Sequence, residues 1–234
     1  MEIFRPYIQI NPDTWKRRQH FEQFGRGDYP YIGVTTDVDI TNLLPACRDH
    51  GARFFTAFLY ITIRAMNAVE NFRYRLFEDQ IVLCDLIDPS FNTFNPEDEL
   101  FYFSYSVYNP NYRIFAIDVE QAKQTAIKEK RLASDNRVDV VYVSCLPWFR
   151  FSDIIQPMGL AANDTIPRVV WGKYETDGDG RTTVPFSITG HHGLFDGHHI
   201  ARLLTGMEEL INNPAFLKSP STKVIRRDEA GQNG

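Results

Sequence analysis

The stretch Ser187-Ile188-Thr189-Gly190-His191-His192-Gly193-Leu194-Phe195-Asp196-Gly197-His198-His199 decides the fold of this 234-residue chain. Before it, residues 182–189 alternate between apolar and polar side chains, which predicts a strand. After it, apolar residues recur at helical spacing over 197–211, and Asn212-Asn213-Pro214 ends that helix. The histidine pair therefore lies where a strand gives way to a helix, and a loop there can present it to a cleft.

The rest of the chain repeats this mixture of strands and helices. Helical spacing predicts helices over 55–69 and 117–132, the second more exposed because charged residues surround its few alanines. Strands are predicted over 72–77 and 80–84, as a hairpin around Glu78-Asp79, and over 101–108 and 138–145. We therefore expect one α/β domain over 1–218, on a mixed or antiparallel sheet. The polar residues 219–234 predict a flexible C-terminal tail.

Composition excludes several functions. The net charge is -5, and no basic run is longer than Lys16-Arg17-Arg18, so nucleic-acid binding is not expected. No apolar stretch reaches the roughly 18 residues that a membrane span needs. The N-terminus has no signal-peptide pattern, and three cysteines far apart indicate neither a disulfide framework nor zinc. We expect a cytoplasmic protein. Its 14% of aromatic residues fits a core or interface better than a large pocket.

Histidine is the side chain best suited to take a proton near neutral pH. A base held at the end of a strand can activate a substrate hydroxyl. Gly193 and Gly197 permit tight turns, and Asp196 can cap the following helix. Two alternatives remain. His192 and His199 could converge on a metal, although no carboxylate or thiolate set accompanies them. His198 and His199 could be ordinary surface histidines.

The pattern His-His-x-x-x-Asp-Gly before an amphipathic helix resembles chloramphenicol acetyltransferase and its superfamily, which includes dihydrolipoyl acyltransferases and condensation domains. Three segments in the family's order narrow the resemblance to the chloramphenicol type, over about Trp15 to Pro214. They are Trp15-Lys16-Arg17-Arg18-Gln19-His20-Phe21-Glu22, Ser144-Cys145-Leu146-Pro147-Trp148 and Gly172-Lys173-Tyr174. The resemblance implies a two-layer sandwich, with a mixed, largely antiparallel sheet packed against helices.

The resemblance also implies catalytic roles. His192 would be the general base, and Ser144 would donate a hydrogen bond to the oxyanion. Asp196 would be a structural carboxylate paired with Arg17, which suits a bidentate partner. Without the resemblance, Arg17 reads as a solvated surface charge and Ser144 as a small polar residue that ends a strand.

The same resemblance implies the ligands and the assembly: acetyl-CoA as co-substrate, no metal, and a homotrimer with active sites at the subunit interfaces. The acceptor pocket would be lined by Phe24, Tyr29, Phe101, Phe103 and Val170, for whose aromatic members plain core packing is the alternative. The coenzyme channel would be lined by Lys173, Tyr174, Arg53 and Trp148.

Two positions depart from the family pattern. Phe24 stands where the family has a tyrosine, and Val170 where it has a threonine that helps to order a water near the transition state. We therefore expect an acetyl-CoA-dependent O-acetyltransferase whose acceptor is chloramphenicol or a similar small alcohol. The alternatives are the same chemistry on an unrelated metabolite alcohol, a catalytically inactive ligand-binding homologue, and a metal-dependent hydrolase.

Overall fold

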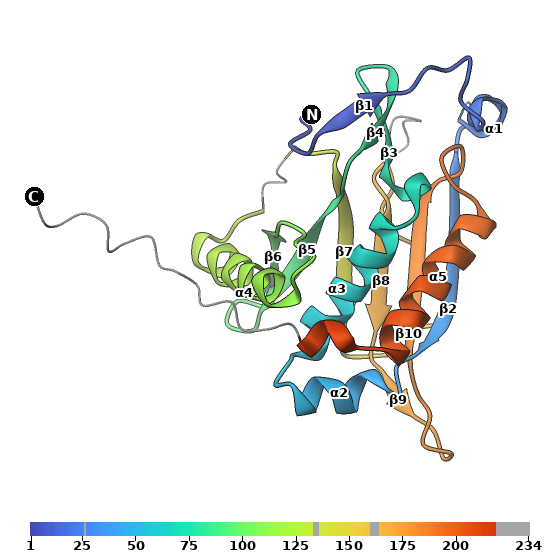
Figure 1. The fold of residues 1–234 in the computed structure, drawn as a ribbon. Helices are drawn as coiled ribbons and strands as arrows, with labels where there is room; N and C mark the ends of the chain where they lie inside the picture. Colours follow the sequence, from blue (N-terminus) through green and yellow to red (C-terminus); the bar gives the residue numbers. More distant parts are fainter. Residues whose placement is uncertain (26, 133–135, 160–163, 219–234) are drawn as a thin grey trace, which may run out of the picture.

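The computed structural model describes residues 1–25, 27–132, 136–159 and 164–218 (Figure 1). The predicted tail, 219–234, lies outside the described residues. Within them, two sheets and a layer of helices form the fold, and the helices cover one face of the larger sheet (Figure 1). The helices are α1 (Arg18–Phe24), α2 (Leu43–Asp49), α3 (Phe54–Asn67), α4 (Tyr112–Glu129) and α5 (Gly197–Asn212), with short 3-10 turns at Glu70–Arg73 and Ala215–Lys218.

The larger sheet is mixed and largely antiparallel. In spatial order it contains β2 (Tyr31–Asp39), β10 (Thr182–His191), β8 (Arg168–Gly172), β7 (Val140–Leu146), β5 (Asp88–Asn95) and β6 (Leu100–Tyr105), and the short β9 (Glu175–Thr176) also pairs with β10. The pairs β5–β7 and β7–β8 are parallel, and the others are antiparallel. The two-layer α/β architecture and the mixed sheet confirm the predicted fold class.

The core lies between this sheet and the helices. Apolar side chains at alternate strand positions face the helices, as the period of two in a strand requires. Among them are Phe91, Val143, Trp171 and Phe186, all of which are at most 2% exposed. From the other side, α5 contributes the predicted apolar stripe, and its buried members are Ile200, Leu203, Met207 and Ile211.

Strand β10 is buried on both faces. Val184, Phe186 and Ile188 face the helices as predicted, but Ser187 and Thr189 on the opposite face are also buried. The segment between β7 and β8 crosses that second face: Asp153 accepts a hydrogen bond from Thr35 of β2, and Gln156 donates one to Thr189. Alternation in the sequence could not predict this cover, because polar side chains on a strand normally indicate solvent.

Some predicted boundaries were wrong for local reasons. The strand predicted from Phe72 begins at Tyr74, because Phe72 and Arg73 belong to a 3-10 turn. The helix predicted from Ile117 begins at Tyr112, where the side chain of Asn111 accepts hydrogen bonds from the N–H groups of Arg113 and Ile114. Capping of this kind satisfies amides that a helix start leaves without partners. The helix predicted over 55–69 is α3, and the strands predicted over 101–108 and 138–145 are β6 and β7.

The predicted hairpin is confirmed. Strands β3 (Tyr74–Phe77) and β4 (Gln80–Cys84) pair antiparallel, with Phe77 opposite Gln80. Glu78 and Asp79 both have positive φ, 49° and 60°, as a two-residue hairpin turn of the favoured twist requires. Strand β1 (Tyr7–Gln9) adds to β4 and completes the smaller sheet.

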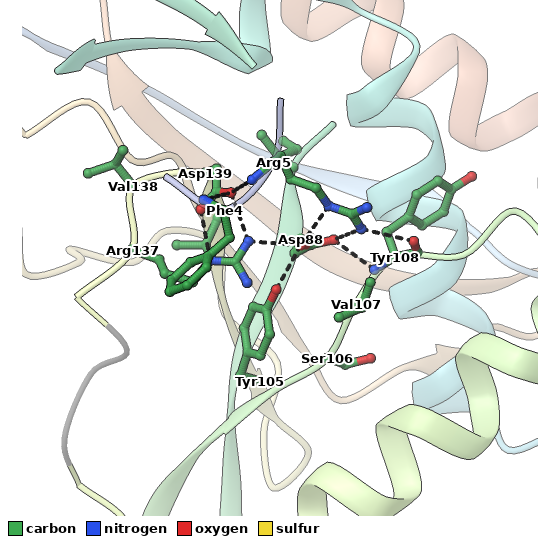
Figure 2. Close-up of polar contacts among 12 residues, drawn as sticks. Phe4, Arg5, Asp88, Tyr105, Ser106, Val107, Tyr108, Arg137, Val138 and Asp139 are labelled. Atoms are coloured by element: carbon green, nitrogen blue, oxygen red, sulfur yellow. Dashed lines mark hydrogen bonds and ion pairs between the residues drawn. The ribbon is translucent and has the colours of Figure 1, made fainter. Parts of the chain in front are cut away.

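A cluster of buried and partly buried ions fastens the N-terminal segment to the larger sheet (Figure 2). We call Arg5, Asp88, Arg137 and Asp139 the N-terminal clamp. Arg5 donates to Asp88 (Nε–Oδ2 2.9 Å), and Arg137 binds Asp139 with two hydrogen bonds of 2.8 Å. Asp139 also accepts the backbone N–H groups of Phe4 and Arg5. Two cations thus pair with two carboxylates. The carboxylates belong to Asp88 at the start of β5 and Asp139 just before β7, and each of these two residues is at most 1% exposed.

Candidate active site

His192 lies one residue beyond β10, and two backbone carbonyls position it. Its N–H donates to the carbonyl of Pro30 at 2.8 Å. Its ring Nδ1 lies 3.2 Å from the carbonyl oxygen of Phe195. Because a carbonyl only accepts, Nδ1 must carry the proton, and in the neutral ring Nε2 then keeps its lone pair. A half-buried imidazole with a fixed basic nitrogen is suited to take a proton from a substrate.

Helix α1 lies over the histidine pair. Phe24 stacks on the ring of His192 (centroids 4.0 Å apart), and Phe21, one helical turn earlier, stacks on the buried His191 at 5.5 Å. Residues three apart share one face of a helix, so a single short helix contacts both rings. The predicted acceptor residue Phe24 therefore meets the predicted base.

Gly193 follows the pair because a side chain would not fit there. A Cβ would lie 2.9 Å from the ring of Phe21 and 3.0 Å from that of His191. Of the described glycines, only Gly51 and Gly180 have positive φ. The backbone freedom that the sequence suggested at Gly193 and Gly197 is therefore not used, and close packing is the reason for Gly193.

Arg17 and Asp196 hold the loop that carries His192. The guanidinium donates to Asp196 Oδ2 (2.7 Å) and to the carbonyls of His192 (3.1 Å) and Gly193 (3.0 Å). Its side chain is only 11% exposed, so the alternative of a solvated surface charge was wrong. The predicted pair is thus present, and it ties the N-terminal segment to the loop after β10.

Asp196 also begins α5, as predicted. Its side chain accepts the N–H of His198 at 3.1 Å, and His199 Nδ1 lies 2.9 Å from its Oδ1. Burial alone raises the pKa of Asp196, but the hydrogen bond from Arg17, the nearby His199 and Arg17 charges and the His198 amide together lower it to about 2. His198 is exposed, but His199 is largely buried against Asp196, so His199 is not an ordinary surface histidine. Burial lowers the pKa of His199.

Ser144 lies on β7, on the sheet face away from the helices. Asn92 of β5 donates a hydrogen bond to its Oγ (3.0 Å). Both line a pocket of about 420 Å³, which we call the Ser144 pocket, together with Phe101, Phe103, Gln156 and Arg168. Burial raises the pKa of the neighbouring Cys145 thiol to about 11, so that thiol is not a nucleophile at neutral pH.

One row across the sheet contains Ser144 and Val170. Register places Ser144 beside Val170, Val170 beside Ser187, and Ser187 beside Thr35. Val170 is 3% exposed in this row of otherwise hydroxyl-bearing residues. It neighbours the predicted oxyanion donor, whereas Phe101 and Phe103 line the pocket itself.

His192 and Ser144 do not meet within one chain. Of the described residues that line the Ser144 pocket, none is His192, Tyr29 or Phe24, which stacks on His192. Ser144 shares its row with Ser187, two strands away, and His192 is five residues beyond Ser187. At strand spacings of about 4.8 Å and a rise of about 3.3 Å per residue, the two positions lie roughly 20 Å apart. The predicted site residues therefore form two separate groups.

Two of the four predicted coenzyme residues, Arg53 and Tyr174, lie near the start of α3. Arg53 precedes α3, forms an ion pair with Glu120 of α4 and lines a surface pocket of about 550 Å³. Tyr174 packs edge-on against Phe54, the next residue after Arg53. Trp148 contacts Phe94 and is exposed, as is Lys173. Arg53 and Tyr174 are thus close together through Phe54, whereas Trp148 packs against Phe94 of β5 instead.

The sequence analysis missed two residues at these sites, Asn92 and Glu120, and it did not find the contact of His199 with Asp196. Asn92 had no signal, because a segment with two asparagines and a proline does not have the pattern of a strand.

Across the described ranges, no three His, Cys, Asp or Glu residues are grouped to hold a metal ion. No helix found there has the length and apolar character to cross a membrane.

Comparison with known proteins shows the family of the chain. The family model for chloramphenicol acetyltransferase matches residues 5–208. The chain is 28% identical to chloramphenicol acetyltransferase 3 of Escherichia coli over 88% of its own length and 98% of that protein. It is 29% identical to a chloramphenicol acetyltransferase of Streptomyces acrimycini, over 89% and 96%.

Solved structures show the same fold. A chloramphenicol acetyltransferase superposes with a TM-score of 0.79 at 24% identity, over 88% of this chain and all of that one. A probable dihydrolipoamide acetyltransferase from Listeria monocytogenes gives 0.61 at 16% identity, over 92% and 97%. With its two-layer fold and strand-end histidine pair, the chain is an acyltransferase. It belongs to the chloramphenicol acetyltransferase family.

Proposed function

We propose that this acetyltransferase moves the acetyl group of acetyl-CoA to a hydroxyl of chloramphenicol or a similar small alcohol, using one domain over residues 1–218. The observation that carries the proposal is the hydrogen bond between His192 Nδ1 and the carbonyl of Phe195. It leaves Nε2 as the base, and Arg17 fixes the same loop through Asp196 and two carbonyls.

The mechanism follows from these groups. His192 Nε2 takes the proton of the acceptor hydroxyl while that oxygen attacks the thioester carbonyl. A positioned base of this kind contributes roughly 10²–10⁴-fold. Ser144 donates to the carbonyl oxygen as it becomes an oxyanion, which contributes roughly 10²–10³-fold. The tetrahedral intermediate then expels the coenzyme A thiolate, which takes the proton from the imidazolium, and the ester is released.

This mechanism needs two copies of the chain. One substrate carbonyl must lie within about 3 Å of both groups, and within one chain they are roughly 20 Å apart. We therefore propose a homotrimer in which His192 of each copy faces the Ser144 pocket of the next. Exposed apolar side chains on the sheet face away from the helices, among them Phe94 and Phe101, support such an interface.

The acceptor chemistry is supported by the Ser144 pocket. Phe101 and Phe103 offer rings to an aromatic acceptor, and Gln156 and Arg168 offer donors. Phe24 and Tyr29 would approach from the neighbouring copy with His192. Chloramphenicol is the leading acceptor, and the family's names support it.

Acetyl-CoA is supported as the acetyl donor by the family. Arg53, Tyr174, Lys173 and Trp148 would line its path, with cations available for its phosphates. The mechanism routes no step through a metal. Three free cysteines suit a reducing compartment, and we propose that the reaction takes place in the cytoplasm.

The direct test mixes the purified protein with acetyl-CoA and chloramphenicol and follows thiol release. We expect thiol and acetylated chloramphenicol in equal amounts, and loss of both in His192→Ala. Release with other small alcohols but none with chloramphenicol would identify a different acceptor. Binding of acetyl-CoA without release on any alcohol would instead indicate an inactive ligand-binding homologue.

Subunit complementation tests the shared site. His192→Ala and Ser144→Ala should each be nearly inactive alone. Equal amounts are unfolded together and refolded, so that trimers form at random. In each interface the base and the donor come from independent copies, and about a quarter of the sites regain both groups. If the refolded mixture stays inactive while refolded wild type regains its activity, each chain holds a complete site.

A further inference from the structure

The amide of Asn92 forms the one side-chain hydrogen bond that reaches Ser144 Oγ among the described residues. A serine hydroxyl has one proton to donate and two lone pairs that accept. Asn92 Nδ2 lies 3.0 Å away and donates to one of these lone pairs. The Ser144 proton therefore cannot point toward Asn92. It is left to point toward the pocket that both side chains line.

From this contact we infer that Asn92 is a positioning residue for the reaction, which sets the Ser144 hydroxyl as a donor before the substrate arrives. The inference rests on the proposed function, in which Ser144 stabilises the oxyanion. A hydroxyl that already faces the developing charge does not have to reorganise during the reaction. A freely rotating hydroxyl would spend part of its time turned away from it.

The fold keeps the two residues in register. Strands β5 and β7 run parallel, with Asp88 beside Val140 and Phe91 beside Val143, so Asn92 reaches Ser144 one step further along. The N-terminal clamp fastens the starts of both strands, through Asp88 on β5 and Asp139 just before β7 (Figure 2). A slip of one residue would turn Asn92 to the other face of the sheet.

The residue type fits this role. An amide nitrogen can only donate, whereas a hydroxyl at position 92 could also accept and a carboxylate could only accept. Asn92→Asp keeps the size of the side chain but reverses the polarity of the contact, so that Ser144 would donate to the carboxylate. Asn92→Ala removes the contact and leaves the hydroxyl free to rotate.

The test is a double-mutant cycle of Asn92→Ala and Ser144→Ala, measured as kcat and KM for thiol release. In wild type, we expect Asn92→Ala to lower kcat about tenfold, with KM changed less than about twofold. Asn92→Asp should lower kcat further. In the Ser144→Ala background, Asn92→Ala should have almost no further effect, because no hydroxyl remains to be positioned.

The matched control is Asn42→Ala, since Asn42 is exposed and also donates its amide to a side-chain oxygen, that of Asn212. It should behave as wild type. If Asn92→Ala does not fold, the strand-forming Asn92→Val replaces it and is judged in the same way, with melting temperatures for all variants.

Three outcomes with the Asn92 variants overturn the inference, and a fourth overturns the proposed role of Ser144 as well. Asn92→Ala could lower kcat equally in both backgrounds, which would indicate an effect on folding or binding. Asn92→Asp could be as active as wild type. Asn92→Ala could be as active as wild type while Ser144→Ala is impaired, in which case the proposed function stands alone. If Ser144→Ala itself is fully active, the proposed role of Ser144 fails together with the inference.

Discussion

Arg17 and Asp196, 179 positions apart in the sequence, form an ion pair of 2.7 Å directly behind the candidate base. The same guanidinium binds the carbonyls of His192 and Gly193. One side chain thus joins the N-terminal segment, the loop after β10 and the N-cap of α5. The pair sets the backbone from which the imidazole projects, without touching its ring nitrogens.

Replacing Arg17 by lysine should impair catalysis. A single ammonium cannot reproduce three hydrogen bonds that diverge from a planar guanidinium, so the His192 loop should shift. A shift of about 1 Å at the reacting atoms can lower the rate up to about 100-fold. We expect kcat to fall at least about tenfold and the melting temperature to fall. The control is Arg18→Lys. Arg18 is the next residue, but it forms exposed ion pairs, with Asp13 and Glu22, so this variant should match wild type. Equal activity of the two variants would contradict the prediction.

Asp196 should make stability depend on acid pH. Its folded pKa of about 2 lies below the ordinary value of about 3.9. The stabilisation is therefore fully present above pH 4 or so, and it is lost as the pH falls through 2. The free energy of unfolding of wild type should exceed that of Asp196→Asn by an amount that shrinks over this window, as urea titrations at several pH values would measure. In an Arg17→Ala background, this difference in unfolding free energy should shrink less as the pH falls. If it shrinks as much as with Arg17 present, Arg17 does not lower the pKa of Asp196.

The sequence predicted the parts of the fold that depend on local pattern. The strand, histidine pair and helix from 182 to 211 were located correctly, because alternation, a capping aspartate and an apolar stripe are each visible along the chain. β5 was missed because its polar residues face a pocket and a buried ion cluster, not solvent. The cover over Ser187 and Thr189 was missed because it comes from a segment more than 30 residues away.

The candidate site was predicted as a set of residues but not as an arrangement. The resemblance supplied Arg17, Ser144, Asp196 and His192 together. The strand order of the sheet places Ser144 on β7 two strands away from β10, which His192 follows. The sequence does not show this order, so it could not show that the four residues form two separate groups. Asn92 and Glu120 are defined by contacts between elements far apart in the sequence, and no local pattern indicates such contacts.

The N-terminal clamp should contribute strongly to stability. Asp139→Ala removes one carboxylate partner from the buried Arg137 and leaves the backbone N–H groups of Phe4 and Arg5 without their acceptor. We therefore expect the free energy of unfolding to fall by about 3–5 kcal/mol. Asp13→Ala, which breaks an exposed pair with Arg18, should lose less than about 1 kcal/mol. Urea unfolding would measure both, and similar losses would contradict the prediction.

The clamp should also be sensitive to acid. Burial alone raises the pKa of Asp139, but the hydrogen bonds from Arg137, Arg5 and Phe4 and the charge of Arg137 lower it below its ordinary value. The stabilisation that ionised Asp139 gives to the fold is therefore complete above the ordinary carboxyl pKa. It is lost as the pH falls below that value and through the lowered pKa of the folded state. The difference in unfolding free energy between wild type and Asp139→Asn should narrow in acid, and a difference that widens would contradict the sign.

Val170→Thr should raise turnover of chloramphenicol if that is the acceptor. Threonine has nearly the shape of valine, so the backbone of β8 should stay in place. The new hydroxyl would lie in the row between Ser144 and Ser187, where it would be available to order a water. We expect kcat with chloramphenicol to rise by up to about tenfold, with a small loss of stability. Val169→Thr is the control, because Val169 is 0% exposed and faces the helices in the apolar core, where a buried hydroxyl costs stability. That variant should lose stability and gain no activity. Equal kinetics of the two variants would mean that position 170 does not decide the acceptor.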